Sequence, residues 1–263
     1  MGVRFGSAMR GSGRDVVGAF AVALRSATAW TRRLALLVLN DNVQPDRVPM
    51  PPAVAARPRD DRGYPVPAIT PWLDGRPTFA ATSTSRTLIC AVERRCSICG
   101  TALGDAPVCR VVAGPEAQAI ADAATDGTRY QNRAPTAEAP GHLVCMLYAA
   151  IVCPYLARPN ARRGVDVSIG GFVASRGAAR GDVDGVGGAV VGFRSYEFEL
   201  GDTVAFRFDG VTFVRPHLLG TEHLTELRDM LAATTHDPMP LDICPPYLLD
   251  DEDAADRRAA TYR

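Results

Sequence analysis

The sequence predicts an α+β protein built from two small units, and three observations support this prediction. An Ala-rich stretch, GPEAQAIADAATDG, and an apolar run, LVCMLYAAIVC, have the composition of helices in the middle of the chain. The segments AVVGFRSYEFEL and VAFRFDGVTFV alternate apolar and polar residues, as half-buried strands do. The 24 Gly and 20 Pro among 263 residues interrupt these patterns often, so regular elements should be short.

Composition narrows the classes of function. A hydrophobic content of 47% and a charged content of 22% are ordinary for a globular protein and argue against wholesale disorder. The 29 basic and 29 acidic residues give a formal net charge of +0, which leaves no overall field to attract nucleic acid or an anionic membrane. Every basic residue is an arginine, so Arg-rich segments alone say little about nucleic acid.

Cysteine usage and the N-terminal segment favour a cytoplasmic protein. Seven Cys form an odd set, and we expect reduced thiols rather than a disulfide framework. Neither of the apolar runs VVGAFAVAL and TRRLALLVL reaches membrane-spanning length. A basic start precedes the first run, but no clean small-residue cleavage site follows it, so export is the weaker alternative. We expect no membrane association.

The first expected element is a helix over residues 16–39, which is mostly apolar. Met50 begins a segment that resembles an alternative protein start, so residues 1–50 are predicted to be a loosely attached N-terminal extension. Residues 45–71 are Pro-rich and should be extended, because proline disfavours helix in the residue before it. The run TLICAVE fits either a strand or a short helix.

Residues 51–160 are predicted to be the first folded unit. A strand is expected around residues 108–114, followed by a helix over 115–127. Pro115 suits the first helical position and Gly127 the position just past the end. A second helix should begin near Pro140 or His142 and end near Pro154.

A Gly- and Arg-rich linker is predicted over residues 161–188, followed by a β-hairpin and helix unit over 189–240. The pair Asp209-Gly210 is typical of two-residue hairpin turns, and we place the turn there. The glycine-rich segment GDVDGVGGAVVG lacks the spacing of phosphate-binding or calcium-binding loops.

The helix of the second unit should be capped by Thr221. Its apolar residues recur at helical spacing and are expected to form a buried stripe. Residues 241–263 are predicted to be a solvated acidic tail. The expected stripe consists of Leu224, Leu227 and Leu231.

Four residues form a candidate metal site. Cys96 and Cys99 in CSICG can face one point when a tight turn folds between them, and Gly100 helps the chain to leave that turn. His142 and Cys145 in PGHLVC are three residues apart at the start of a predicted helix, which places both side chains on one face. Three cysteines and one histidine are a usual ligand set of structural zinc sites.

A knuckle, β-structure and a helix whose first turn supplies the second ligand pair together predict a small treble-clef-like zinc module. The separation between Cys99 and His142 requires the helix at 115–127 to be an insertion, which loop-closure entropy tolerates. Four full ligands close the metal shell, so a structural role is expected rather than a catalytic one. A redox pair and incidental core cysteines stay open as alternatives, although no βαβ context for a thioredoxin-like pair is evident.

The remaining thiols have separate expectations. Cys90 and Cys109 lie in apolar segments and should be small buried hydrophobes. Cys153 lies two turns beyond Cys145, about 12 Å along a helix axis, and is expected to pack in the core. Cys244 precedes two prolines and should be structural or exposed.

The order of CSICGTALG, HLVC and CPYL resembles that of a group of uncharacterised proteins found in actinobacteria and their phages. The resemblance covers roughly residues 65–160. It implies the metal site and a cytoplasmic location, and it implies no activity.

The leading functional hypothesis is a non-enzymatic, zinc-stabilised interaction protein with a protein partner. One alternative is an enzyme of hydrolase or nuclease type, for which the sequence identifies no catalytic residues. Three histidines cluster loosely in the second unit: His217, His223 and His236. We expect them to be solvent-exposed and not to form a second metal or acid–base site. The other alternative is nucleic-acid binding through five arginines near the module: Arg94, Arg95, Arg158, Arg162 and Arg163.

Overall fold

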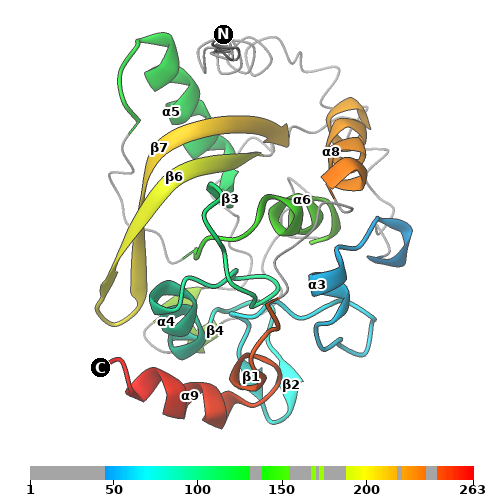
Figure 1. Ribbon diagram of the computed structural model, residues 1–263, viewed down its shortest axis with the longest axis vertical. Coiled ribbons are helices and arrows are strands. Elements are labelled where there is room, and N and C mark those ends of the chain that lie inside the picture. The colour runs from blue at the N-terminus through cyan, green and yellow to red at the C-terminus, as the bar shows by residue number, and fades with distance from the viewer. Residues whose placement is uncertain are drawn as a thin grey trace, which may run out of the picture.

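The computed structural model describes residues 45–130, 138–153, 167–169, 172–174, 188–217, 221–234 and 242–263. It is a mixed α/β protein in which helices surround a three-stranded antiparallel sheet (Figure 1). The helix expected at 16–39 lies outside the described residues. Within those residues, no helix combines the length and apolar character needed to cross a membrane.

The central sheet has the strand order β3-β6-β7. Strand β3 (Val108–Ala113) pairs antiparallel with the first part of β6 (Gly188–Leu200), from Gly188 to Phe193. Strand β7 (Val204–His217) pairs with β6 along the whole length of β6. Among the described residues, the second half of β6 therefore has a strand partner on one side only.

The predicted turn at Asp209-Gly210 is wrong. The chain reverses at residues 201–203, where Gly201 N donates to Thr203 O over 3.0 Å. Asp209 and Gly210 lie inside β7, close to a register shift in the β6–β7 pairing. Gly210 has a φ of +66°, the backbone conformation that favours Gly in turns. Here that conformation accommodates an irregular strand, which is the other common use of such a glycine.

The N-terminal part of the first unit is less extended than its prolines suggest. Residues 45–71 contain the short helices η1 (Pro45–Arg47) and α3 (Pro52–Ala55). A small β1 (Trp72–Leu73) and β2 (Arg76–Pro77) pair follows. The run TLICAVE forms part of helix α4 (Thr84–Val92), so its helical alternative is the correct one.

Both helices predicted for the first unit are confirmed. Helix α5 (Gly114–Thr125) carries Pro115 in its first turn, and Gly127 just beyond it has a φ of +67°. Helix α6 (Leu143–Val152) begins directly after its N-cap residue, His142. Both helices contact β3 and β6, so the apolar residues of α6 form part of the protein core.

The predicted linker is described only in part. Strands β4 (Val167–Ile169) and β5 (Phe172–Ala174) form an antiparallel pair within it. Helix α8 (Thr221–Thr234) follows β7 and contacts α6 and β7. Leu227 and Leu231 are buried as expected, whereas the side chain of Leu224 lies outside the described set.

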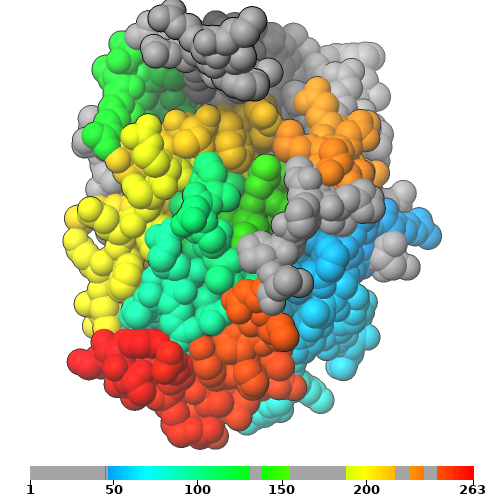
Figure 2. All heavy atoms as spheres, viewed as in Figure 1, coloured from blue at the N-terminus to red at the C-terminus, as the bar shows by residue number. Residues whose placement is uncertain are grey.

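The prediction of a solvated acidic tail is wrong. Residues 242–263 contain η2 (Pro246–Leu248) and helix α9 (Glu252–Ala260), which packs on α4. Figure 2 shows these C-terminal residues, in orange and red, packed against the rest of the molecule. Arg86 of α4 is fully buried, and its Nε donates to Glu252 Oε2 over 2.6 Å. The acidic composition hid an Ala face, of which Ala255 and Ala259 are completely buried.

A single buried cluster contains residues from both predicted units. Ile89 and Leu147 come from the segment 51–160, whereas Val190 and Phe206 come from the segment 189–240. The pairing of β3 with β6 joins the two segments in one sheet. Three of the candidate metal ligands, Cys96, Cys99 and Cys145, belong to this shared core. Gly141, the residue before His142, forms a bridge with Cys109 of β3.

Candidate metal centre

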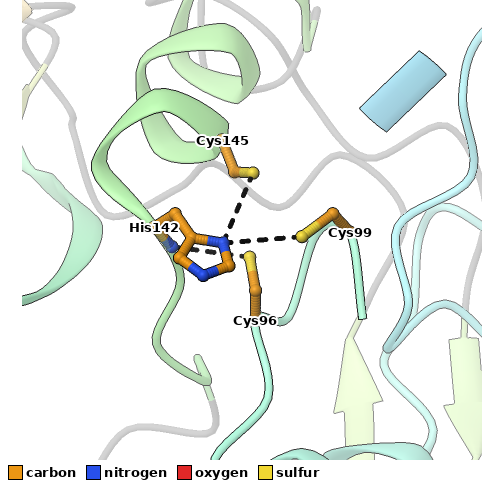
Figure 3. Close-up of side chains that lie close together, drawn as sticks. All are labelled: Cys96, Cys99, His142 and Cys145. Carbon is orange, nitrogen blue, oxygen red and sulfur yellow. Dashed lines mark hydrogen bonds between the residues drawn. The ribbon is translucent and has the colours of Figure 1, made fainter. Parts of the chain in front are cut away.

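The segment around Cys96 and Cys99 forms a tight knuckle. Gly100 N donates to Cys96 O, and Cys96 N donates to Thr101 O, each over 2.8 Å. Gly100 has a φ of +80°, which an L side chain rarely adopts. The sequence CSICG therefore folds as expected, with both thiols on the same side of the turn (Figure 3).

The second ligand pair lies at the start of α6. His142 is the N-cap residue, and Cys145 lies in the first helical turn. The residue before them, Gly141, exchanges two backbone hydrogen bonds of 2.8 Å with Cys109 of β3. Ser97 N also donates to Pro140 O over 2.9 Å. These bonds fix the start of the helix directly against the knuckle.

The four predicted ligands converge. The Sγ atoms of Cys96, Cys99 and Cys145 and one ring nitrogen of His142 lie within 4.8 Å of one another. His142 Nδ1 lies 3.5 Å from Cys99 Sγ and 3.8 Å from Cys145 Sγ (Figure 3). Metal–sulfur and metal–nitrogen bonds of about 2.3 and 2.0 Å place tetrahedral ligand atoms about 3.5–3.8 Å apart. The cluster has dimensions close to those of a tetrahedral metal site.

Hydrogen bonds link the thiols of the cluster. Burial opposes ionisation of Cys96, but hydrogen bonds from Cys145, Cys99 and the His142 backbone outweigh it and lower the pKa of Cys96 well below its ordinary value. Hydrogen bonding to Cys96 and Cys99 raises the pKa of Cys145, because its proton is shared with them. A metal ion replaces such shared protons and permits all three sulfurs to ionise.

Among the described residues, this is the group of His, Cys, Asp and Glu side chains whose donor atoms could hold a metal ion. No protein-family model, curated protein or solved structure matches the chain. What the site can do therefore follows from its own geometry. Three thiolates and an imidazole fill all four positions of a tetrahedron, which leaves none open for a reacting water.

Three residues that support the ligands were not predicted from the sequence. Thr101 Oγ1 lies 3.1 Å from Cys99 Sγ, and Ala102 O lies 2.8 Å from His142 Nε2. Ala102 N in turn donates to Asp242 Oδ2 over 2.7 Å. Thr101 and Ala102 adjoin the knuckle and could have been found there. Nothing local marks Asp242, which is 140 residues away.

The other cysteines lie outside the cluster, and all seven are free thiols. Cys90 and Cys109 are fully buried, as predicted, and burial raises the pKa of Cys109 to about 12. Cys153 is only half-buried, at the end of α6. Cys244 is also half-buried, and it accepts a hydrogen bond of 2.9 Å from the buried Arg57.

The arginines considered for nucleic-acid binding differ in availability. The guanidinium of Arg95 is engaged by Glu93 and by Asp242, at 2.6 and 2.9 Å. The guanidinium of Arg94 lies over the ring of Tyr196, 5.5 Å from its centroid, and is not ion-paired within the described part of the chain. The remaining three, Arg158, Arg162 and Arg163, lie outside the described residues, as do His236 and the side chains of His217 and His223.

Proposed function

We propose that the chain is a zinc-stabilised interaction protein without enzymatic activity, and that Cys96, Cys99, His142 and Cys145 hold the ion. The convergence of their four donor atoms within 4.8 Å carries this proposal. Thiolate and imidazole ligands in a tetrahedral arrangement suit zinc better than magnesium or calcium, which take oxygen ligands.

The metal would act as a cross-link in a treble-clef-like module. It joins a knuckle to the first turn of α6, with β3 and the inserted α5 between them. Because such a site does not exist in the unfolded chain, the free energy of metal binding contributes to folding. We also propose that the chain is related to the actinobacterial and phage proteins that it resembles. This part of the proposal rests on the order of its motifs alone.

A structural role is preferred over an enzymatic one because the ligand shell has no open position. A groove between the end of α4 and the β6–β7 hairpin offers no clear catalytic set among the residues that the structure describes. Its lining includes Glu197 and Glu199 but no histidine, and Glu199 is ion-paired with Arg207. Nucleic-acid binding is less favoured, since the net charge is +0 and Arg95 is already engaged. The need for reduced thiolates supports a cytoplasmic location.

Metal analysis of the purified full chain tests the proposal. We expect about one zinc per chain in the wild-type protein and almost none in Cys96→Ser and His142→Ala. Cys153→Ser is the matched control, because this cysteine is the C-cap residue of the helix that carries Cys145 and lies outside the cluster. A wild-type chain that is folded, reduced and free of metal would contradict the proposal.

A further inference from the structure

The second half of β6 has an unpaired strand edge. Residues 194–200 pair with β7 on one side. On the other side the pairing with β3 extends only as far as Phe193, which lies opposite the first residue of β3. Within the described segments, no hydrogen bond reaches their backbone from the side away from β7. In an antiparallel strand, alternate residues direct their N–H and C=O groups to each side. The edge can therefore accept another strand.

A groove of about 540 Å³ lies between this part of the hairpin and the end of α4. In Figure 1 the far end of the β6–β7 hairpin lies beside α4. Val92 lines the groove with 39% of its surface exposed. The partly buried aromatic side chains of Tyr196 and Phe198 also line it. Leu200, at the hairpin tip and outside the lining, is 42% exposed. The free edge thus has apolar contacts beside it.

Arg94 occupies a position where glycine is usual. It follows the C-cap residue of α4 with a φ of +51°, and Arg95 N closes the helix end on Cys90 O. Glycine is common at this position because it has no side chain to strain. An arginine held there, with its guanidinium over Tyr196 and without an ion pair in the described part of the chain, suggests a binding role.

Charged side chains flank the groove on both faces of β6. Glu197 is exposed and forms no ion pair with any described residue. Its neighbours Tyr196 and Phe198 point to the opposite face of β6, where the ring of Tyr196 meets Arg94. Arg207, opposite Glu197 in β7, also lines the groove and is ion-paired with Glu199. An added strand would therefore meet the cation of Arg94 on one face and the carboxylate of Glu197 on the other.

We propose that an extended peptide adds as a strand to residues 194–200 of β6, with an acidic side chain against Arg94 and a basic side chain facing Glu197. This inference rests on the proposed interaction role but not on the metal site. Backbone pairing supplies affinity, and the alternating charges supply register.

Other occupants fit the same edge less well. Antiparallel pairing with a second copy of β6 would bring Glu197 and Glu199 of both chains together, and like charges on facing strands are unfavourable. The groove lining carries Glu197 and Glu199 as well as Arg94 and Arg207, so it offers nucleic-acid phosphates no excess of positive charge. A peptide of alternating charge meets neither obstacle.

A phage-displayed library of random 12-residue peptides, selected against the metal-loaded full chain, tests the proposal. Enriched peptides should alternate acidic or apolar residues with basic ones. Fluorescence anisotropy should give an affinity that falls at least tenfold in Arg94→Gly. Because glycine suits this backbone, the melting temperature of that variant should not fall. Arg94→Glu should select peptides with a basic residue instead, whereas Arg47→Glu, an exposed change outside the groove, should have no effect.

Hydrogen exchange locates the bound peptide. Amides within 194–200 should exchange more slowly in the complex. Peptides that bind but protect other amides would leave the interaction role standing and overturn the assignment to the β6 edge. Failure to enrich any peptide, indifference to Arg94→Gly, or protection of these amides by self-association would also overturn it. Metal content measured on the same samples reports separately on the zinc site.

Discussion

The Nε2 atom of His142 lies 2.8 Å from the carbonyl oxygen of Ala102. A carbonyl can only accept, so Nε2 carries the proton and Nδ1 is left with its lone pair toward the sulfur atoms. A backbone contact therefore selects the nitrogen that can bind a metal. Such second partners of a ligating histidine fix both its tautomer and its ring orientation.

Loss of Asp242 should weaken metal binding, because its carboxylate accepts from Ala102 N and from Arg95. We expect Asp242→Ala to lower zinc affinity about tenfold, at the lower end of the usual range for such partners, since the carboxylate is 36% exposed. Competition with a chromophoric chelator measures this. Asp250→Ala, an exposed acidic residue of the same segment, is the control, and equal affinities for the two variants would contradict the role of Asp242.

A methyl group added at Gly100 should destabilise the knuckle. Its Cβ would lie 2.5 Å from Cys244 Sγ, and the φ of +80° disfavours any side chain. Gly104 has a φ of +65° with nothing within 4 Å of its Cβ position, so Gly104→Ala isolates the backbone effect. Urea unfolding of the zinc-loaded chain should give losses of about 1 kcal/mol for Gly104→Ala and about 2–3 kcal/mol for Gly100→Ala. Equal losses would mean that Cys244 does not pack against the knuckle.

Glu93 should make stability depend on pH. Burial opposes its ionisation, but hydrogen bonds from Tyr262, Arg95, Tyr247 and Arg258 prevail and lower its pKa to about 2. Because this pKa lies below the ordinary value of 4.5, the stabilisation is present above pH 4.5 and is lost as the pH falls toward 2.

We therefore compare unfolding free energies of the wild-type chain and Glu93→Gln. The wild type should be more stable by about 1–3 kcal/mol near neutral pH, the usual value of hydrogen bonds to a charged group. The difference should shrink steadily below about pH 4.5. Both proteins lose their metal in acid, so the contribution of metal loss to the unfolding free energy cancels when the two are compared. A difference that stays constant from neutral to acid pH would show that the charge of Glu93 does not stabilise the folded protein.

The ligands could be predicted because each half of the site has a local signature. The spacing of Cys96 and Cys99 before a glycine favours a tight turn, and the spacing of His142 and Cys145 places both on one helix face. The meeting of the halves depends on backbone bonds such as Ser97 N to Pro140 O. Those bonds join backbone atoms of residues far apart in the sequence, and no pattern of side chains indicates them.

Two wrong predictions share a physical cause. The pair Asp209-Gly210 has the chemistry of a turn, yet its positive φ is used inside a long strand, because pairing with β6 outweighs the local preference. The acidic residues after Leu248 suggested solvation, yet Glu252 meets the buried guanidinium of Arg86, a partner 166 residues away. Local composition could not reveal either tertiary contact.

X-ray absorption spectroscopy at the zinc edge, on the full chain purified under reducing conditions, identifies the atoms bound to the metal. We expect one zinc bound by three sulfur atoms at about 2.3 Å and one nitrogen at about 2.0 Å. In His142→Cys the nitrogen should be replaced by a fourth sulfur. A shell dominated by oxygen, or the same nitrogen in both proteins, would contradict the proposed zinc site.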